Sequence, residues 1–161
     1  MYMSARINYF QTAPKAMGIM MNMEKYIASC YGEKNTLEHE LIELIKIRVS
    51  QINGCAYCLD MHTKDAATIG MTTERINLVA TWEDSHCYSV KEKLALAWAE
   101  ATTLLSQKGI SDDLYHAIAK IFNQEEIVDL TIVVNAINAW NRFGVSFLAE
   151  SGVYQPGDFD F

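Results

Sequence analysis

The chain has 161 residues, of which half are apolar and a fifth are charged, and it carries a formal net charge of −7. This length suits one domain with a hydrophobic core of its own, so we expect residues 1–161 to form a single domain. An acidic chain, with an isoelectric point of about 5.0, argues against nucleic acid and anionic lipid as partners, and no apolar run reaches the ~18 residues of a membrane helix.

Apolar residues recur with helical spacing along the chain, and no segment alternates with a period of two, which predicts an all-α fold. We expect a single-domain bundle of about six to seven helices. In chain order, the pattern predicts an extended arm at residues 1–13, helices at residues 14–32, 36–52, 55–70, 72–80, 89–106, 111–122 and 124–148, and an irregular tail after residue 152.

Local signals define the expected helix ends. Pro14 suits the first position of a helix, because an N–H there would have no intrahelical partner. Thr36 is the expected N-cap of the second helix, and Ser89 with Glu92 has the sequence pattern of a capping box. Apolar residues cover most of the circumference of the second helix, so we expect it to be the buried centre of the bundle.

The most distinctive pattern lies where the second and third expected helices meet. Cys55 and Cys58 are three positions apart, His62 follows four positions later, and all three fall on one face of a helix. Glu43 lies in the apolar helix before them, where a buried charge needs a partner. That partner is His62, if the two helices pack side by side, or Lys46 in the same helix; alternatively, Glu43 faces solvent on the side of Ile47.

Redox chemistry is one interpretation of this pattern. A thiol reacts as thiolate, which a helix N-terminus stabilises, and His62 lies one turn beyond Cys58 and could accept its proton. Cys58 is therefore the expected nucleophile towards a peroxide oxygen, and Cys55 would condense with the resulting sulfenic acid to form a disulfide. A thiol or dithiol reductant would restore the pair by exchange. Glu43 could orient or exchange protons with His62 and Cys55, provided that the second helix packs beside the third.

Two other interpretations use the same residues. The two cysteines and the histidine could hold zinc with a fourth ligand from Glu43, His86 or Cys87, although His86 and Cys87 are adjacent and are not spaced like a ligand pair. Alternatively, the cysteines are small apolar residues of the core, because unpaired cysteine is commonly buried. We expect core packing for Cys30 and Cys87. No pattern points to a haem, a flavin or a nucleotide, so we expect no cofactor.

A polar and aromatic stripe marks the last expected helix. It contains Trp140, Asn141 and Arg142, together with Asn135 and Asn138 one turn apart. Hydrogen bonding between helices explains this stripe at least as well as contact with a substrate does.

Glu43, eleven intervening residues and the run CAYCLDMH at 55–62 resemble the core motif of the alkylhydroperoxidase D proteins, in the carboxymuconolactone decarboxylase family. The segments KLALAWAEA (93–101) and INAWNRFG (137–144) are similar to a small single-domain branch of that family. The resemblance extends over residues 8–144. One position departs from the pattern, because Tyr57 stands where these proteins often have a histidine, so we expect no extra proton-transfer role there.

The resemblance implies an all-helical protein that assembles as a homo-oligomer, a trimer or a hexamer. It also implies roles for the matching residues. The second cysteine, Cys58, would be the peroxidatic thiol, and Cys55 would be the resolving thiol. His62 and Glu43 would relay protons, and the motif selects Glu43 and not Glu40.

We therefore expect a thiol peroxidase that reduces organic or hydrogen peroxide through a Cys55–Cys58 disulfide cycle, with a thiol or dithiol as reductant. Thiols stay reduced in the cytoplasm, and residues 1–10 lack the apolar core of a secretory signal, so we expect a cytoplasmic location. Two alternatives are a helical oligomer that senses redox state or docks a partner without turnover, and a decarboxylase of small lactone acids that uses His62 and Glu43. The true lactone decarboxylases of this family generally lack the CxxC pair.

Overall fold

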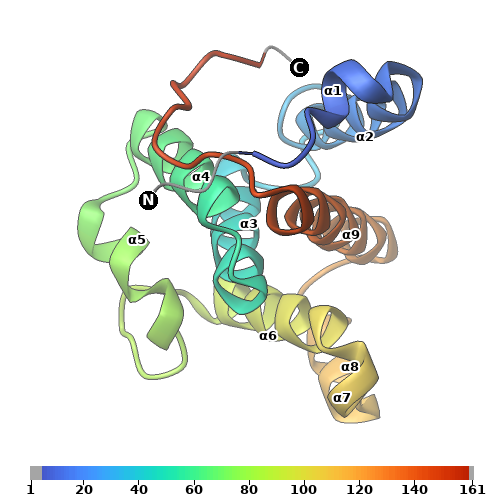
Figure 1. The fold of residues 1–161 in the computed structure, drawn as a ribbon. Helices are drawn as coiled ribbons and strands as arrows, with labels where there is room; N and C mark the ends of the chain where they lie inside the picture. Colours follow the sequence, from blue (N-terminus) through green and yellow to red (C-terminus); the bar gives the residue numbers. More distant parts are fainter. Residues whose placement is uncertain (1–4, 160–161) are drawn as a thin grey trace.

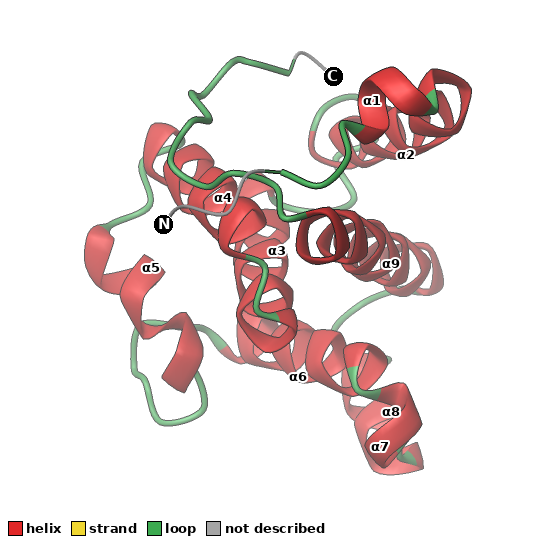
Figure 2. Ribbon diagram, in the orientation of Figure 1, coloured by secondary structure: helices red, strands yellow, loops and turns green. Residues whose placement is uncertain are grey.

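The computed structural model describes residues 5–159, without the side chain of Lys108, and shows an all-helical fold (Figure 1). Within that range it has nine α-helices and one 3₁₀-helix, and none of these residues lies in a strand (Figure 2). The helices are α1 (Tyr9–Thr12), α2 (Pro14–Tyr31), α3 (His39–Asn53), α4 (Ala56–Thr68), α5 (Thr73–Leu78), the 3₁₀-helix η1 (Val79–Thr81), α6 (Val90–Thr103), α7 (Leu105–Lys108), α8 (Asp112–Ile118) and α9 (Gln124–Phe147). The expected fold class is confirmed. No helix in the described part of the chain has both the length and the hydropathy of a membrane span.

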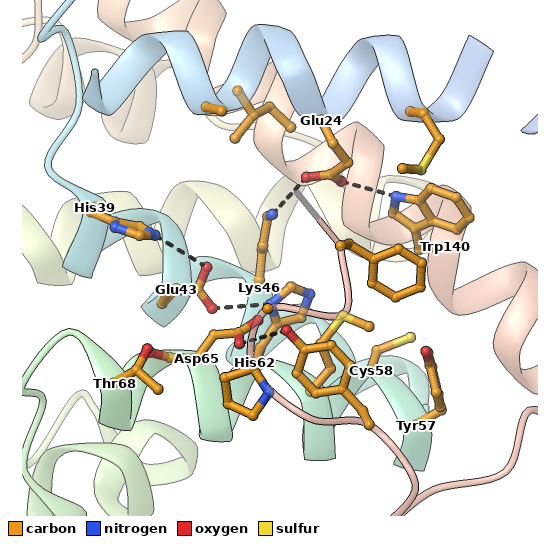
Figure 3. A pocket seen from close by; sticks show the side chains of 18 of the residues that line it. Glu24, His39, Glu43, Lys46, Tyr57, Cys58, His62, Asp65, Thr68 and Trp140 are labelled. Carbon is orange, nitrogen blue, oxygen red and sulfur yellow. Dashed lines mark hydrogen bonds and ion pairs between the residues drawn. The ribbon is translucent and has the colours of Figure 1, made fainter. Parts of the chain in front are cut away.

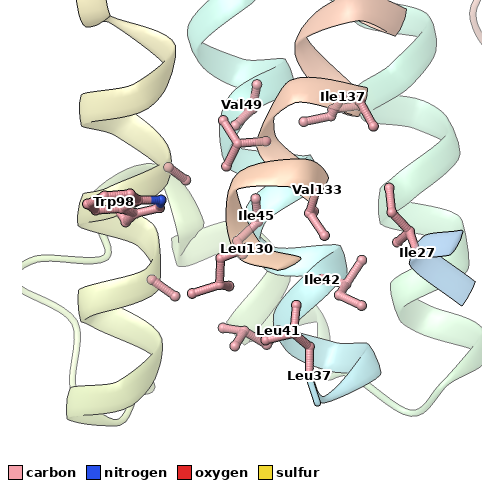
Figure 4. Packing of buried hydrophobic residues seen from close by; sticks show 14 of the residues in the cluster. Ile27, Leu37, Leu41, Ile42, Ile45, Val49, Trp98, Leu130, Val133 and Ile137 are labelled. Atoms are coloured by element: carbon pink, nitrogen blue, oxygen red, sulfur yellow. The ribbon is translucent and has the colours of Figure 1, made fainter. Parts of the chain in front are cut away.

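α3 is the central helix of the bundle, and α4, α6 and α9 pack against it (Figure 1). Its apolar side chains face two hydrophobic clusters. Leu41 and Ile45 belong to the cluster that joins α3 to α6 and α9, part of which Figure 4 shows. Leu44 and Ile47 belong to the other cluster, which surrounds Val79. Each such side chain contributes roughly 1.5–3 kcal/mol when it is removed from water. The predicted buried central helix is thus confirmed.

The second long helix begins later than expected, so the prediction that Thr36 is its N-cap is wrong. α3 starts at His39, and Glu38 occupies the N-cap position without a side-chain capping hydrogen bond. The Thr36 hydroxyl instead donates to Oδ2 of Asp129 at 2.7 Å. The hydroxyl of Thr36 therefore binds the buried carboxylate of Asp129 and does not cap the helix, although its local sequence favours capping.

The expected extended arm contains a short helix, which corrects that prediction. α1 begins after Asn8, whose side chain accepts a hydrogen bond from the backbone N–H of Gln11. α1 and α2 remain separate because a residue before proline is kept out of the helical conformation, and Ala13 indeed has φ −136° and ψ 60°. Residues 1–4 of the arm lie outside the described range. Pro14 opens α2 as predicted.

The described residues contain more α-helices than the six to seven that we predicted, because α1 lies in the expected arm and one expected helix is divided in two. The expected helix at 89–106 is divided into α6 and α7. α8 ends at Ile118, after which turns bury Phe122. The capping box of Ser89 and Glu92 is present and opens α6 as predicted.

Candidate active site

The junction between α3 and α4 places the CxxC pair at the start of a helix. Gly54 adopts a left-handed conformation (φ 67°) that ends α3, a conformation in which other residues are strained. Cys55 is the N-cap of α4, and its Sγ accepts a hydrogen bond from the backbone N–H of Cys58 at 3.3 Å. The cysteines therefore lie at the positive end of the α4 dipole, where negative charge on sulfur is favoured.

Cys55 and Cys58 form a disulfide, with their Cα atoms 5.4 Å apart. Both residues are buried. Gly144 of α9 lies directly against the pair, because a Cβ atom built on it would be 2.7 Å from Sγ of Cys55 and 3.5 Å from Sγ of Cys58. Only a glycine fits there without displacing the sulfur atoms.

A pocket of about 230 Å³ lies beside the disulfide, between α2, α3, α4 and α9 (Figure 3). Cys58 lines this pocket and Cys55 does not. Glu43 and His62, the other two residues that the motif singled out, also line it. α1 and the segment after α9 contribute the remaining walls. The structure thus brings three of the four predicted residues to one cavity and places the fourth behind Cys58.

Glu43 and His62 form a buried pair, although they are far apart along the chain. Nδ1 of His62 lies 3.0 Å from Oε2 of Glu43, and Nε2 of His39 lies 3.9 Å from the other carboxylate oxygen (Figure 3). Burial alone would raise the pKa of Glu43, but the charge and hydrogen bond of His62 and the charge of Lys46 outweigh it, so that pKa lies below its usual value. Glu43 is therefore an anion that accepts the Nδ1 proton of His62.

A second buried ion pair lines the same pocket. Nζ of Lys46 donates to Glu24 at 2.8 Å, and Nε1 of Trp140 donates to the other oxygen of Glu24 at 2.9 Å (Figure 3). Glu43 and Lys46 therefore do not form the ion pair within α3 that was one alternative, because Lys46 binds Glu24 and Glu43 binds His62. Burial lowers the pKa of Lys46, but the charges of Glu24 and Glu43 more than compensate and raise it. Glu24 is not predictable from the sequence, because nothing in its local pattern distinguishes it from a solvated acid.

Asp65 is a further acid of the pocket that the sequence analysis did not select. Its Oδ1 accepts a hydrogen bond from the hydroxyl of Tyr154 at 2.7 Å. Burial raises the pKa of Asp65, and the hydrogen bond from Tyr154 compensates only in part. One ligand atom each from Glu43, His62 and Asp65 lie within 4.8 Å of one another, so within residues 5–159 these three are close enough to share a metal ion.

The thiol-based zinc site considered above is not assembled. Cys55 and Cys58 are bonded to each other, and Cys87 packs on the hydrophobic cluster around Val79, away from the cluster that contains the disulfide. Cys30 is fully buried in the core as expected, whereas Cys87 is only half-buried.

The polar stripe on α9 makes hydrogen bonds between helices. Nδ2 of Asn53 donates to Asn138 at 3.0 Å and to Asn141 at 2.9 Å, and Asn141 donates to Ser50 at 3.1 Å. These bonds attach α9 to the end of α3, one residue before the turn that leads to the cysteines. Trp140 differs from the asparagines, because it lines the pocket.

Comparison with known proteins identifies the family of this chain. Residues 14–101 match the model of the carboxymuconolactone decarboxylase family. The uncharacterized protein YdfG of Bacillus subtilis (strain 168) is 44% identical over 144 residues, which are 89% of this chain and 95% of YdfG. A solved protein of unknown function from Agrobacterium tumefaciens, described as a candidate AhpD of antioxidant defence, is 38% identical with a TM-score of 0.86 over 94% of this chain and all (100%) of that one. The debrominase Bmp8 shares the fold at 17% identity, with a TM-score of 0.79 over 89% of this chain and 75% of Bmp8. The chain belongs to the carboxymuconolactone decarboxylase family and has an AhpD-like fold.

Proposed function

We propose that this protein is a thiol peroxidase of the alkylhydroperoxidase D type, which reduces organic or hydrogen peroxide through a Cys55–Cys58 dithiol–disulfide cycle. One observation carries the proposal: Cys58 lines a pocket together with the buried Glu43–His62 pair, while Cys55 is bonded to it from behind. The description of the Agrobacterium tumefaciens relative as a candidate antioxidant-defence protein is consistent with this proposal.

The Glu43–His62 pair prepares His62 to act as a base. Because anionic Glu43 accepts from Nδ1, neutral His62 carries its proton on Nδ1 and leaves Nε2 able to accept another. Cys58 is one helical turn from His62 and lines the same pocket. We propose that Nε2 takes the thiol proton of Cys58, and that the N-terminus of α4 stabilises the resulting thiolate.

The reaction then proceeds in three balanced steps. The Cys58 thiolate attacks one peroxide oxygen; the O–O bond breaks, and its electron pair leaves as alkoxide or hydroxide, which takes the proton from His62. Cys58 is now a sulfenic acid. The Cys55 thiol attacks its sulfur, so that the S–S bond forms and water leaves. A thiol or dithiol reductant finally returns both sulfurs to thiols by exchange and is itself oxidised to a disulfide.

We also propose that the protein works as a homo-oligomer. Several apolar side chains that do not line the pocket are exposed, among them Ile19, Val90 and Val128, which are 71%, 71% and 58% exposed. Packing of subunits over these side chains would remove them from water, which favours association. Light scattering on the purified protein would measure the mass directly, and a monomer at all concentrations would contradict this part of the proposal.

Counting thiols tests the proposed function. The reduced protein has four cysteines, and one equivalent of cumene hydroperoxide should remove two thiols, with peptide mapping locating the new bond between Cys55 and Cys58. Consumption of further peroxide should continue when a dithiol is supplied. Fast disulfide formation without turnover under any of several dithiols would instead favour the redox-sensing alternative, and retention of all four thiols would exclude both.

A further inference from the structure

The two ends of the chain build the outer wall of the pocket. Tyr9 and Phe10 of α1 line it from one end of the chain, and Tyr154 and Phe159 line it from the segment after α9. We call these four residues the aromatic cap. All four lie outside the residues 14–101 that match the family model. Figure 1 shows the C-terminal segment running across α4 and then towards α1.

The rings of the cap contact one another across the two ends. The ring centroid of Phe10 lies 6.0 Å from that of Phe159 and 6.0 Å from that of Trp140, and the rings of Tyr154 and Phe159 are 6.2 Å apart. All three pairs are stacked, at separations in the favourable range for aromatic rings. The cap is therefore a continuous aromatic surface.

Polar contacts with α4 hold the C-terminal part of the cap over the pocket. The Tyr154 hydroxyl donates to Asp65 at 2.7 Å, and the Tyr154 carbonyl accepts from Nζ of Lys64 at 2.9 Å. Two residues earlier, the backbone N–H of Gly152 donates to Asp60 at 3.0 Å. Three contacts to residues within about one and a half turns of α4 thus attach the segment around Tyr154 to this helix.

The pocket is lined by two chemically different groups of side chains. Cys58 and the charged pairs of Glu43 and Glu24 come from α2, α3 and α4, and the rings of the cap come from the two ends of the chain. Its volume of about 230 Å³ is below the roughly 300–1,000 Å³ of pockets for drug-sized ligands, so it suits a small molecule. A hydroperoxide group would reach Cys58 while an apolar body lay against the rings, and hydrogen peroxide would gain nothing from the rings.

We propose that the aromatic cap makes the site selective for organic hydroperoxides that carry an aromatic ring. The aromatic ring of the bound hydroperoxide would be removed from water by Phe10, Phe159 and Trp140. It would also make ring–ring contacts with them, which a compact, branched alkyl group cannot make. The expected difference in reaction rates rests on the proposed peroxidase function. Binding of the aromatic ring by the cap does not depend on turnover.

Two matched hydroperoxides test this selectivity. Cumene hydroperoxide and tert-butyl hydroperoxide differ only by a phenyl group in place of a methyl group. Their rates of oxidation of the reduced protein, each divided by the rate with free dithiothreitol, should differ by about tenfold in favour of the cumyl compound, since burial of a ring is worth at least one factor of ten. Phe10→Ala and Phe159→Ala should each reduce this ratio to about threefold or less, on the same basis.

Tyr115→Ala is the control, because Tyr115 lies on α8 and is a half-exposed ring that does not line the pocket. It should keep the ratio of the parent protein. A parent ratio near one, or a ratio that neither cap variant changes, would overturn the inference while leaving the proposed function in place.

A binding measurement separates the inference from the chemistry. Calorimetry on the disulfide form should show 2-phenyl-2-propanol binding about tenfold more tightly than tert-butanol, and Phe10→Ala should remove most of that difference. If neither hydroperoxide oxidises the protein, the proposed function fails, and this measurement alone decides the inference. Equal affinities of the two alcohols for the parent protein would then overturn it.

Discussion

Two buried carboxylates of this protein, Asp129 and Glu43, have similar burial and very different surroundings. Asp129 of α9 accepts hydrogen bonds from the hydroxyls of Tyr26 and Thr36 at 2.6 and 2.7 Å, and from Nζ of Lys34 at 3.1 Å. Glu43 of α3 accepts from His62 and opens on the pocket beside Cys58. Asp129 does not line that pocket.

The pKa values of the two acids move in the same direction for different reasons. Burial raises both, and in both cases it is outweighed: by hydrogen bonds from Tyr26, Thr36 and Lys34 at Asp129, and mainly by His62 at Glu43. The donors of Asp129 stay protonated at neutral pH and fasten α2 and the α2–α3 connection to α9. The partner of Glu43 is an imidazole that lines the pocket together with Cys58. A carboxylate surrounded by fixed donors therefore stabilises the fold, and one paired with an imidazole beside a thiol can serve chemistry.

The largest effect is expected for His62→Gln. The glutamine side chain can still donate a hydrogen bond to Glu43, so the buried pair is preserved, but it cannot accept the proton of Cys58. We expect oxidation of the reduced protein by peroxide to slow by at least about a hundredfold, the usual contribution of a general base. Stopped-flow measurement of tryptophan fluorescence or thiol loss would record it. A rate within a factor of three of the parent, about 0.6 kcal/mol, would show that the pair is structural, like Asp129.

Asp129→Ala should reduce the stability of the fold without changing the chemistry of the pocket. It removes the acceptor of three donors, and we expect the free energy of unfolding to fall by about 3 kcal/mol, as when one partner of a buried charge pair is lost. Urea unfolding would measure this, and the rate of thiol oxidation should stay the same, because Asp129 is not in the pocket. The conservative control, Asp129→Asn, should lose less, since its oxygen still accepts from one hydroxyl.

The stability that Asp129 contributes should also depend on pH. Its pKa in the folded protein is below the ordinary value of 3.8. The contribution is therefore fully present above that ordinary pKa and is lost as the pH falls through the lower, folded value. Parent and Asp129→Asn proteins should accordingly converge in stability in acid, and a constant difference at all pH values would contradict the hydrogen-bonded anion.

Gly144→Ala is expected to cause the next largest loss of stability. The new methyl group would lie 2.7 Å from Sγ of Cys55, and such overpacking typically costs about 1–3 kcal/mol. Gly18 of α2 provides a matched control, because it is also a helical glycine and a Cβ there would meet nothing within 4 Å. Gly18→Ala should raise the stability by up to about 1 kcal/mol. Equal effects of the two substitutions on thermal unfolding would show that the sulfur atoms do not pack against α9.

Asp65→Asn should have the smallest effect on stability and the opposite dependence on pH from that of Asp129. Its pKa is raised in the folded protein, above the ordinary value of 3.8. The charged form is therefore unfavourable to folding, and the parent protein loses stability as the pH rises from that value through the folded pKa. The amide can still accept from Tyr154, so the variant should gain stability relative to the parent as the pH rises. Urea unfolding of both proteins across this pH range would measure the difference in free energy of unfolding. A variant that loses stability relative to the parent as the pH rises would contradict the prediction.

The sequence predicts the fold well where a helix is specified by its own residues. The all-round apolar pattern of α3 indicates a central helix, and Ser89 with Glu92 marks the start of α6. The prediction fails at Thr36, because its hydroxyl bonds to Asp129, 93 positions away along the chain. A capping preference is local, and no local pattern reveals a tertiary hydrogen bond that competes with it.

The site is predictable in part for the same reason. Cys55, Cys58 and His62 lie on one short helix, so their spacing alone brings them together, and Glu43 follows from the motif. Asp65 lies on α4 as well, three positions after His62, but a single acid on a helix is not a distinctive pattern. Glu24 comes from α2, and the aromatic cap comes from the two ends of the chain. Only the packing of the bundle brings them to the pocket, and their residue types are common on ordinary protein surfaces.

The order of action of the two cysteines is the central claim, and trapping the sulfenic acid tests it most directly. Reduced Cys55→Ser and Cys58→Ser proteins would be mixed with cumene hydroperoxide and dimedone and examined by mass spectrometry. We predict that Cys55→Ser reacts at the rate of the parent protein and accumulates a dimedone adduct on Cys58, because no resolving thiol removes the sulfenic acid, whereas Cys58→Ser forms no adduct at Cys55. Oxidation of Cys58→Ser as fast as that of the parent protein would contradict the account.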